Sequence, residues 1–192
     1  MEEITENNFD ERLLSVGGDE IVRPIYTMPL HEGRLVKYCR SLDIPFYLPL
    51  HKVWKVVNQR HGDRQYQYPK EVMRPMFPSY VFVKMNPDQR SLLYKSNSIA
   101  KILAVTDQAH LLEEIQVVRQ LESIALTEEL DFNASLKEGE KFLIESGPWQ
   151  GIYGWLVKKE KRYLWTIEIE CLNGIVQATI DPSKYKMTKV EE

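Results

Sequence analysis

The pattern of apolar residues changes after Gly139, and this change divides the chain into two units. Upstream, strand-like and helix-like segments alternate. Downstream, turn-forming residues separate five short apolar runs, which read "KFLIE", "GWLVKK", "YLWTIEIE", "IVQATI" and "YKM". Closing such strands into a barrel removes edges that would otherwise aggregate. We therefore expect a small β-barrel over residues 139–192, after an aperiodic linker over 127–138.

Residues 163–180 support strands in this second unit. They are rich in Ile, Val, Thr, Tyr and Trp, which favour strands over helices. Asn173-Gly174, the strongest short hairpin signal, interrupts them.

Residues 21–126 predict an α+β sandwich of the ferredoxin-like type. Extended segments are expected at 21–27, 46–50, 79–85 and 100–105. Helices are expected from Met28-Pro29 to Leu42, from Asn86-Pro87 and from Asp107. Because the helices would lie on one face of the sheet, the other face would be open.

The segment 51–75 predicts a protruding β-hairpin with Gly62-Asp63 in its turn. Basic residues dominate it, and three aromatic residues lie among them: Trp54, Tyr66 and Tyr68. Lysine and arginine neutralise phosphates, and aromatic rings stack on bases. An ordinary solvated hairpin with cross-strand aromatic pairs explains the same composition. The candidates for nucleic-acid binding are Lys52, Trp54, Lys55, Arg60, Arg64 and Arg74.

The stretch "RPMFPSYVFVKM" (74–85) places aromatic residues at the mouth of an apolar strand. Val81, Phe82 and Val83 are expected in the core. Phe77 and Tyr80 lie beside two prolines, where exposure is plausible. An exposed groove lined by such side chains suits a partner's helices.

Composition excludes several classes of protein. The chain has no apolar run of about 18 residues, and its beginning lacks the pattern of a secretory signal. The two cysteines, Cys39 and Cys171, are expected to be reduced in a cytoplasmic protein. Residues 1–20 carry seven acidic residues against Arg12 alone and predict a disordered tail. No spacing suggests a metal site, a cofactor or a catalytic group, so we expect no enzyme.

Three motifs resemble the NusG family of transcription elongation factors. The stretch "RPMFPSYVFVKM" is similar to the family's Phe-Pro-Gly-Tyr motif, with Ser79 in place of the glycine. "IYTMPLHEGRLVKYCRSLDIPFYLPL" resembles its opening strand and helix, with a Thr-x-Pro-x-His-Glu pattern like that of specialised paralogues of the RfaH, UpxY and LoaP type. "GEKFLIESGPWQGIYGWLVKK" resembles the KOW motif, whose residues here are Gly147, Pro148, Trp149, Gly151 and Gly154. The family's usual first-strand aromatic pair falls at Val22-Arg23.

The resemblance implies an NGN domain over 21–126 and an SH3-like KOW barrel over 139–192. It implies that the NGN domain binds the clamp helices of the largest RNA polymerase subunit and suppresses pausing or termination. The hairpin would face non-template DNA or nascent RNA, and the barrel would recruit Rho or a small-subunit ribosomal protein. The residues implied in polymerase binding are Ile25, Tyr26, Phe77, Pro78 and Tyr80.

A second function remains open at this point, because KOW barrels also occur in ribosomal proteins. In that case the chain would be an RNA- or ribosome-associated module acting in translation. The basic side chains that would contact RNA cluster at one hairpin tip: Lys158, Lys159, Lys161 and Arg162.

Overall fold

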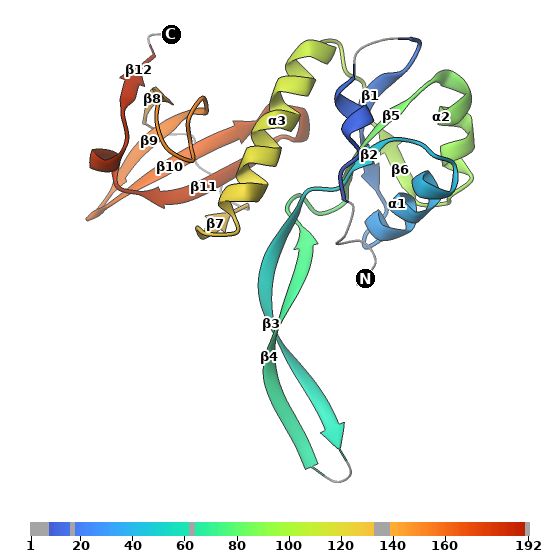
Figure 1. The fold of residues 1–192 in the computed structure, drawn as a ribbon, viewed down its shortest axis with the longest axis horizontal. Helices are drawn as coiled ribbons and strands as arrows, with labels where there is room; N and C mark the ends of the chain where they lie inside the picture. The colour runs from blue at the N-terminus through green and yellow to red at the C-terminus, as the bar shows by residue number, and fades with distance from the viewer. Residues whose placement is uncertain (1–7, 16–17, 62–63, 133–138, 191–192) are drawn as a thin grey trace.

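The computed structural model describes residues 8–15, 18–61, 64–132 and 139–190. In this part of the chain the strands form a four-stranded sheet, a six-stranded sheet and a separate two-stranded hairpin (Figure 1). Helix α3 lies between the two larger sheets, and the hairpin projects away from both (Figure 1). The protein is therefore a mixed α/β structure with a β-rich C-terminal half.

The N-terminal sheet has the order β2-β5-β1-β6. Its strands are β1 (Ile21–Thr27), β2 (Phe46–Tyr47), β5 (Tyr80–Met85) and β6 (Ile99–Ile102). The central pair, β1 and β5, is antiparallel from Ile21↔Met85 to Tyr26↔Tyr80. Strand β2 is shorter than the expected run 46–50, because Pro49 cannot donate to a ladder and its carbonyl instead accepts from the N–H of Met76.

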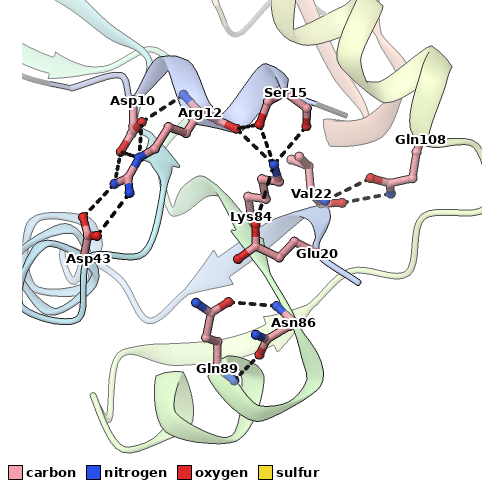
Figure 2. A network of polar contacts seen from close by, with 10 residues as sticks. All are labelled: Asp10, Arg12, Ser15, Glu20, Val22, Asp43, Lys84, Asn86, Gln89 and Gln108. Atoms are coloured by element: carbon pink, nitrogen blue, oxygen red, sulfur yellow. Dashed lines mark hydrogen bonds and ion pairs between the residues drawn. The ribbon is translucent and has the colours of Figure 1, made fainter. Parts of the chain in front are cut away.

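Two helices, α1 and α2, cover one face of this sheet. Helix α2 (Pro87–Tyr94) begins at the predicted Asn86-Pro87 and has a capping box, in which Asn86 and Gln89 exchange hydrogen bonds (Figure 2). Helix α1 covers Glu32–Ser41 and begins later than predicted, since residues 28–31 form a turn in which Leu30 has a positive φ of 64°. Leu35 and Leu93 belong to the core on this face.

The second face of the N-terminal sheet is covered too, so the expected open face is wrong. Helix α3 (Gln108–Ile124) crosses it, and the Gln108 amide pairs with both the N–H and the carbonyl of Val22 (Figure 2). Farther along α3, the Glu122 carboxylate accepts from the Tyr47 hydroxyl at 2.9 Å and from the Leu50 N–H at 2.9 Å. These bonds attach both ends of α3 to the sheet.

Residues 8–15 correct the prediction of a disordered tail over 1–20. They contain a 3-10 helix, η2 (Glu11–Leu14), whose Leu13 is fully buried. The Lys84 ammonium donates to the carbonyls of Arg12 and Ser15, and Arg12 pairs with Asp10 and Asp43 (Figure 2). These partners hold the segment on the sheet. Residues 1–7 of the predicted tail lie outside the described residues.

The C-terminal sheet has the order β12-β8-β9-β10-β11-β7. The five predicted strands are present as β8 (Glu140–Ile144), β9 (Tyr153–Lys159), β10 (Arg162–Ile169), β11 (Gly174–Ile180) and β12 (Met187–Lys189). A sixth, β7 (Leu130–Asp131), comes from the segment expected to be a linker and pairs with β11. Residues 133–138 of that predicted linker lie outside the described part.

Two more 3-10 helices shape the turns of this sheet. They are η3 (Glu170–Leu172), between β10 and β11, and η4 (Pro182–Lys184), before β12. Asn173 ends η3 in the left-handed conformation at φ 47°, so the predicted Asn173-Gly174 turn is confirmed in a longer form.

One apolar cluster joins the two halves. It contains Val22 and Phe82 of the N-terminal sheet, Ile115 and Val118 of α3, and Trp165 of the C-terminal sheet, all buried. Such a shared core means that α3 packs both units together in this structure.

Candidate functional site

The turn Phe77–Tyr80 is held by hydrogen bonds from β1 and α1. Ser79 has a positive φ of 68°, a conformation that is costly for a residue other than glycine. Its N–H donates to the Glu32 carboxylate at 2.7 Å, and its carbonyl accepts from the N–H of Thr27 at 2.7 Å. Glu32 and Thr27 are both buried, so these bonds fix the turn where the family motif has glycine.

Two aromatic rings lie side by side at the mouth of the strands. Tyr26 and Tyr80 are register partners, and their ring centroids are 5.1 Å apart. Burial raises the pKa of Tyr80, with smaller contributions from Tyr26 and Cys171. Tyr26 is 40% exposed, and Pro78 is also exposed. The apolar surface continues through Met28 and Leu30 on the following turn, which are 46% and 92% exposed.

Ile25 does not join this surface, which corrects its assignment to polymerase binding. Successive side chains of a strand point to opposite faces. Ile25 is therefore fully buried in the core beneath α1, while Tyr26 reaches the other side. Val22 belongs to the core near α3.

Phe77 is covered by the C-terminal half of the chain. It is only 5% exposed. A Cβ atom placed on Gly174 would lie 3.2 Å from its ring, so the backbone of β11 begins almost in contact with it. The ring of Phe132 packs edge-on against it, with centroids 6.0 Å apart. The structure thus brings Phe77, Pro78, Tyr80 and Tyr26 together. At the Phe77 end, however, Gly174 and Phe132 cover this surface.

Two polar side chains of α3 hold the C-terminal turns. The Glu114 carboxylate, 7% exposed, accepts from the N–H of Glu170 at 2.5 Å and of Cys171 at 3.0 Å. The Gln120 amide donates to the carbonyls of Pro148 and Gln150 at 2.7 and 3.0 Å. Each side chain therefore satisfies two backbone groups of one turn.

The hairpin of β3 (Leu50–His61) and β4 (Arg64–Pro75), which we call the arm, covers the predicted segment and begins one residue before it. Its predicted turn, Gly62-Asp63, lies outside the described residues. The pairing runs without a register shift from Leu50↔Pro75 to His61↔Arg64. Residues paired across the arm share a face, and successive residues alternate. The register therefore assigns every described side chain of the arm to one of two faces.

The candidate nucleic-acid residues are divided between these faces. Lys52, Trp54 and Arg60 share one face, where Lys52 forms an ion pair of 2.9 Å with Glu71. We call the other face the basic face. On it Lys55 pairs with Lys70 and His51 pairs with Arg74, and two tyrosines lie nearer the tip of the arm. This face contains His51, Lys55, Tyr66, Tyr68, Lys70 and Arg74 together with Val53, Val57, Gln59 and Val72, and none of these residues is acidic. Arg64 begins β4, and its side chain lies outside the described atoms.

His51 lies at the base of the basic face. Burial lowers its pKa, and the nearby Arg74 guanidinium lowers it further. Its ring packs edge-on against Phe132, with centroids 4.6 Å apart. The neutral form of His51 is therefore favoured in the folded protein.

Four residues of the predicted KOW motif lie in the turn between β8 and β9, and the fifth, Gly154, is the second residue of β9. Gly147 and Gly151 have positive φ values of 77° and 84°, which glycine adopts freely. Trp149 between them is fully buried. A Cβ atom on Gly154 would lie 2.7 Å from the Thr166 carbonyl oxygen, so only glycine fits there. Beyond this turn, Lys158, Lys159, Lys161 and Arg162 are exposed around the β9–β10 hairpin tip.

Three of the residues that shape this site were missed from sequence: Glu32, Glu114 and Gln120. Glu114 had a signal, because it lies three residues after Leu111 and four before Val118, on an apolar stripe. A carboxylate at such a position needs a partner. Glu32 and Gln120 gave no signal that separates them from ordinary surface residues.

In the described part of the chain, no group of three or more His, Cys, Asp or Glu side chains could hold a metal ion. No described helix is long and apolar enough to cross a membrane.

The fold consists of an N-terminal α/β unit and a C-terminal β unit that share one apolar core. The family model described as "Transcription termination factor nusG" matches residues 23–122, more than half of the chain. The chain belongs to the NusG family, whose members are transcription factors and not enzymes. It is therefore a transcription elongation factor in general terms, associated with RNA polymerase.

A search of curated proteins gave no match. Among solved structures, the chain is similar to the crystal structure of the MjSpt4:Spt5 complex in conformation B. The identity is 14%, the match covers 90% of this chain and 99% of that chain, and the TM-score is 0.27.

Proposed function

We propose that the chain is a specialised antitermination factor of the RfaH, UpxY and LoaP type, acting in the cytoplasm. Its N-terminal unit, an NGN domain, binds the clamp helices of the largest RNA polymerase subunit and suppresses pausing or termination. The observation that carries this proposal is the aromatic pair of the exposed Tyr26 and the half-buried Tyr80 beside Pro78, on a turn fixed by Glu32. A partly exposed apolar surface on a rigid turn suits packing against helices of a partner.

The basic face of the arm supports a contact with non-template DNA or nascent RNA. Lys55 and Lys70 are register partners on this face, and Tyr66 and Tyr68 are 49% and 40% exposed. Cationic groups neutralise phosphates while tyrosine rings stack on bases. Trp54, 72% exposed on the other face, would form a separate stacking point.

We propose further that the C-terminal unit is a KOW domain that recruits a second partner, either Rho or a small-subunit ribosomal protein. The support is the motif turn Gly147–Gly151 with its buried Trp149, followed by the close approach of β9 to β10 at Gly154.

A capture assay with purified core RNA polymerase tests the polymerase contact. Tyr26→Asp and Tyr80→Asp should each reduce capture by at least ten-fold, because a carboxylate would be desolvated against the partner's apolar helices. Tyr94→Asp is the matched control, since Tyr94 is 47% exposed on α2 and should leave capture unchanged. Circular dichroism must show a retained fold. Full capture by both test variants would refute the assignment.

The exposed lysine and arginine side chains at the β9–β10 tip favour one other function, which is RNA or ribosome binding in translation. That function predicts salt-sensitive RNA binding by the full chain that is lost when Lys158, Lys159, Lys161 and Arg162 are replaced by alanine. A pull-down from lysate at two salt concentrations separates the two functions, since only the first retains polymerase.

A further inference from the structure

The arm has one edge that is blocked and one that is open. In the described part of the chain it is a sheet of two strands, so each strand has one side without a neighbouring strand. Strand β4 contains Pro69 and Pro75, which lack the N–H that a further strand would need, whereas β3 contains no proline. A hairpin of two strands is only marginally stable by itself. A third strand would therefore add to β3 rather than to β4.

The prolines also show which pairs of the arm carry no hydrogen bonds between the strands. In an antiparallel ladder, pairs that exchange two hydrogen bonds alternate with pairs that exchange none. Pro69 lies opposite Val56, and Pro75 lies opposite Leu50. Because a proline cannot donate, these belong to the pairs without bonds, whose backbone groups point outward.

The same alternation assigns the backbone groups at the open edge. The Leu50 N–H confirms the direction, since it donates to the Glu122 carboxylate at 2.9 Å and not across the ladder. Lys52 and Trp54 follow Leu50 at intervals of two residues. Their N–H and carbonyl groups therefore point away from β4, toward the open edge of β3.

The chain just before η2 already runs antiparallel to the residues that precede β3. Phe9 forms an antiparallel bridge with Tyr47, and the Leu48 N–H donates to the Asn8 carbonyl at 2.8 Å. The Asn8 amide donates in turn to the Leu48 carbonyl at 3.0 Å. In this register, each step toward the N-terminus is matched by a step toward the tip of the arm.

Residues 1–7 precede Asn8 and lie outside the described residues. If the register continues, Ile4 faces Lys52 and Glu2 faces Trp54. The Asn8 position carries a ladder bond, so these two positions carry ladder bonds as well. The register from Asn8 and the register of the arm thus select the same backbone groups of β3.

Charge favours this occupant over a second copy of the chain. Residues 1–7 carry three acidic residues and no lysine or arginine: Glu2, Glu3 and Glu6. Strand β3 carries two lysines and an arginine and no acidic residue: Lys52, Lys55 and Arg60. Two copies of β3 set edge to edge would bring these cations together, which is how lysines on an edge strand prevent pairing.

We propose that residues 1–7 bind the open edge of β3 as a third, antiparallel strand of the arm. In this register Glu3 lies on the basic face, opposite Val53 and between His51 and Lys55. The strand places carboxylates where phosphates would bind, so it competes with nucleic acid for the arm. This competition rests on the proposed function, whereas the third strand does not. Because the segment belongs to the same chain, it acts at a high effective concentration even in dilute protein.

Paired cysteines test the register directly in the full chain. Glu3 and Val53 face each other at a position without ladder bonds, where Cα atoms are roughly 4.5 Å apart and a disulfide can form. Val72 is the partner of Val53 on β4, and it lies one strand farther away, too far for a disulfide. Glu3→Cys with Val53→Cys is therefore compared with Glu3→Cys with Val72→Cys in oxidised glutathione. Peptide mapping separates these links from any that involve the native Cys39 and Cys171.

We expect the Glu3–Val53 pair to link within single chains about ten-fold faster than the control pair, because only its geometry fits a disulfide. Circular dichroism must show a retained fold in both variants. Equal rates would mean that the segment does not keep this register. Links that form only between two chains on a non-reducing gel would assign the edge to a second copy. Either result overturns the third strand.

Neutralising the acidic residues tests the competition. Replacing Glu2, Glu3 and Glu6 with glutamine should tighten binding of a fluorescent DNA single strand by about five-fold at low salt, the scale of a few exposed ion pairs, and by less at high salt. The matched control makes the same change of charge at three exposed glutamates elsewhere: Glu11, Glu113 and Glu129. Equal tightening in both proteins would overturn the competition, because net charge alone would then explain it. If no form of the chain binds the strand, the proposed nucleic-acid contact fails and the competition with it, while the disulfide rates still decide whether the third strand forms.

Discussion

The Glu32 carboxylate accepts the N–H of Ser79 at 2.7 Å, and so α1 fixes the turn that carries Phe77 and Tyr80. Ser79 has φ 68°, and a side chain in that region is strained unless its surroundings hold it. Removing Glu32 would take this acceptor away from a buried N–H.

Replacing Glu32 with alanine should therefore lower the free energy of unfolding by about 1–3 kcal/mol, the cost of an unsatisfied buried donor. Glu32→Gln keeps an oxygen acceptor and should cost less. Arg34→Ala, at an exposed position of the same helix, is the control and should change stability by less than about 0.5 kcal/mol. Urea denaturation measures all three, and equal stability of Glu32→Ala and Arg34→Ala would show that the bond contributes nothing.

Gly154 gives a prediction for the C-terminal sheet. Gly154→Ala should destabilise this unit by about 3 kcal/mol, because its Cβ would meet the Thr166 carbonyl oxygen at 2.7 Å and the Trp165 ring at 2.8 Å. Gly151→Ala has no atom within 4 Å of its new Cβ and tests backbone strain alone, which should cost about 1 kcal/mol. Thermal unfolding compares them. A smaller loss for Gly154→Ala than for Gly151→Ala would contradict the close approach.

The two faces of the arm should differ in their contribution to nucleic-acid binding. Replacing Lys55 with alanine should reduce the slope of log affinity against log salt by roughly 0.7–0.9, because a lysine that binds a phosphate releases a counterion. Lys52→Ala should change the slope little, since Lys52 is paired with Glu71 at 2.9 Å. Titration of a fluorescent single strand at several salt concentrations measures the slope. An equal effect of Lys52→Ala would mean that the faces are not distinct.

The lowered pKa of His51 predicts a loss of stability in mild acid. Its pKa in the folded protein lies below the ordinary value of 6.5, through burial and the charge of Arg74. The unfolded chain therefore binds the proton more readily, and the free energy of unfolding should fall as the pH drops below about 6.5. His51→Gln should remove this part of the pH dependence. Urea denaturation at pH 7.5 and 5.5 checks it, and an identical pH dependence of both proteins would exclude His51 as its source.

Local chemistry explains which parts of the fold were predictable. The Asn86–Gln89 capping box and the Asn173-Gly174 turn depend on neighbours in sequence, and both are present. The strands of the C-terminal sheet follow from their residue preferences. In contrast, placing Ile25 and Tyr26 on the correct faces required the register of β1 with β5, since a slip of one residue exchanges the faces.

The covering of Phe77 could not be predicted, for a different reason. Phe77 and Gly174 come from distant parts of the chain, and neither has a local pattern that indicates the other. The same holds for Glu114 and the η3 turn. The sequence therefore indicated a candidate binding residue, but only the tertiary arrangement shows that another part of the same chain covers it.

The length of the arm has a consequence for how tightly it must bind. Each of its strands has 12 residues, a span of roughly 40 Å at the usual rise per residue. Once the Tyr26–Tyr80 end is attached to a large complex, nucleic acid within that radius meets the arm at an effective concentration that can reach about the millimolar range. The nucleic-acid contact that we propose for the arm can therefore be weak in the free protein and still be populated in the complex.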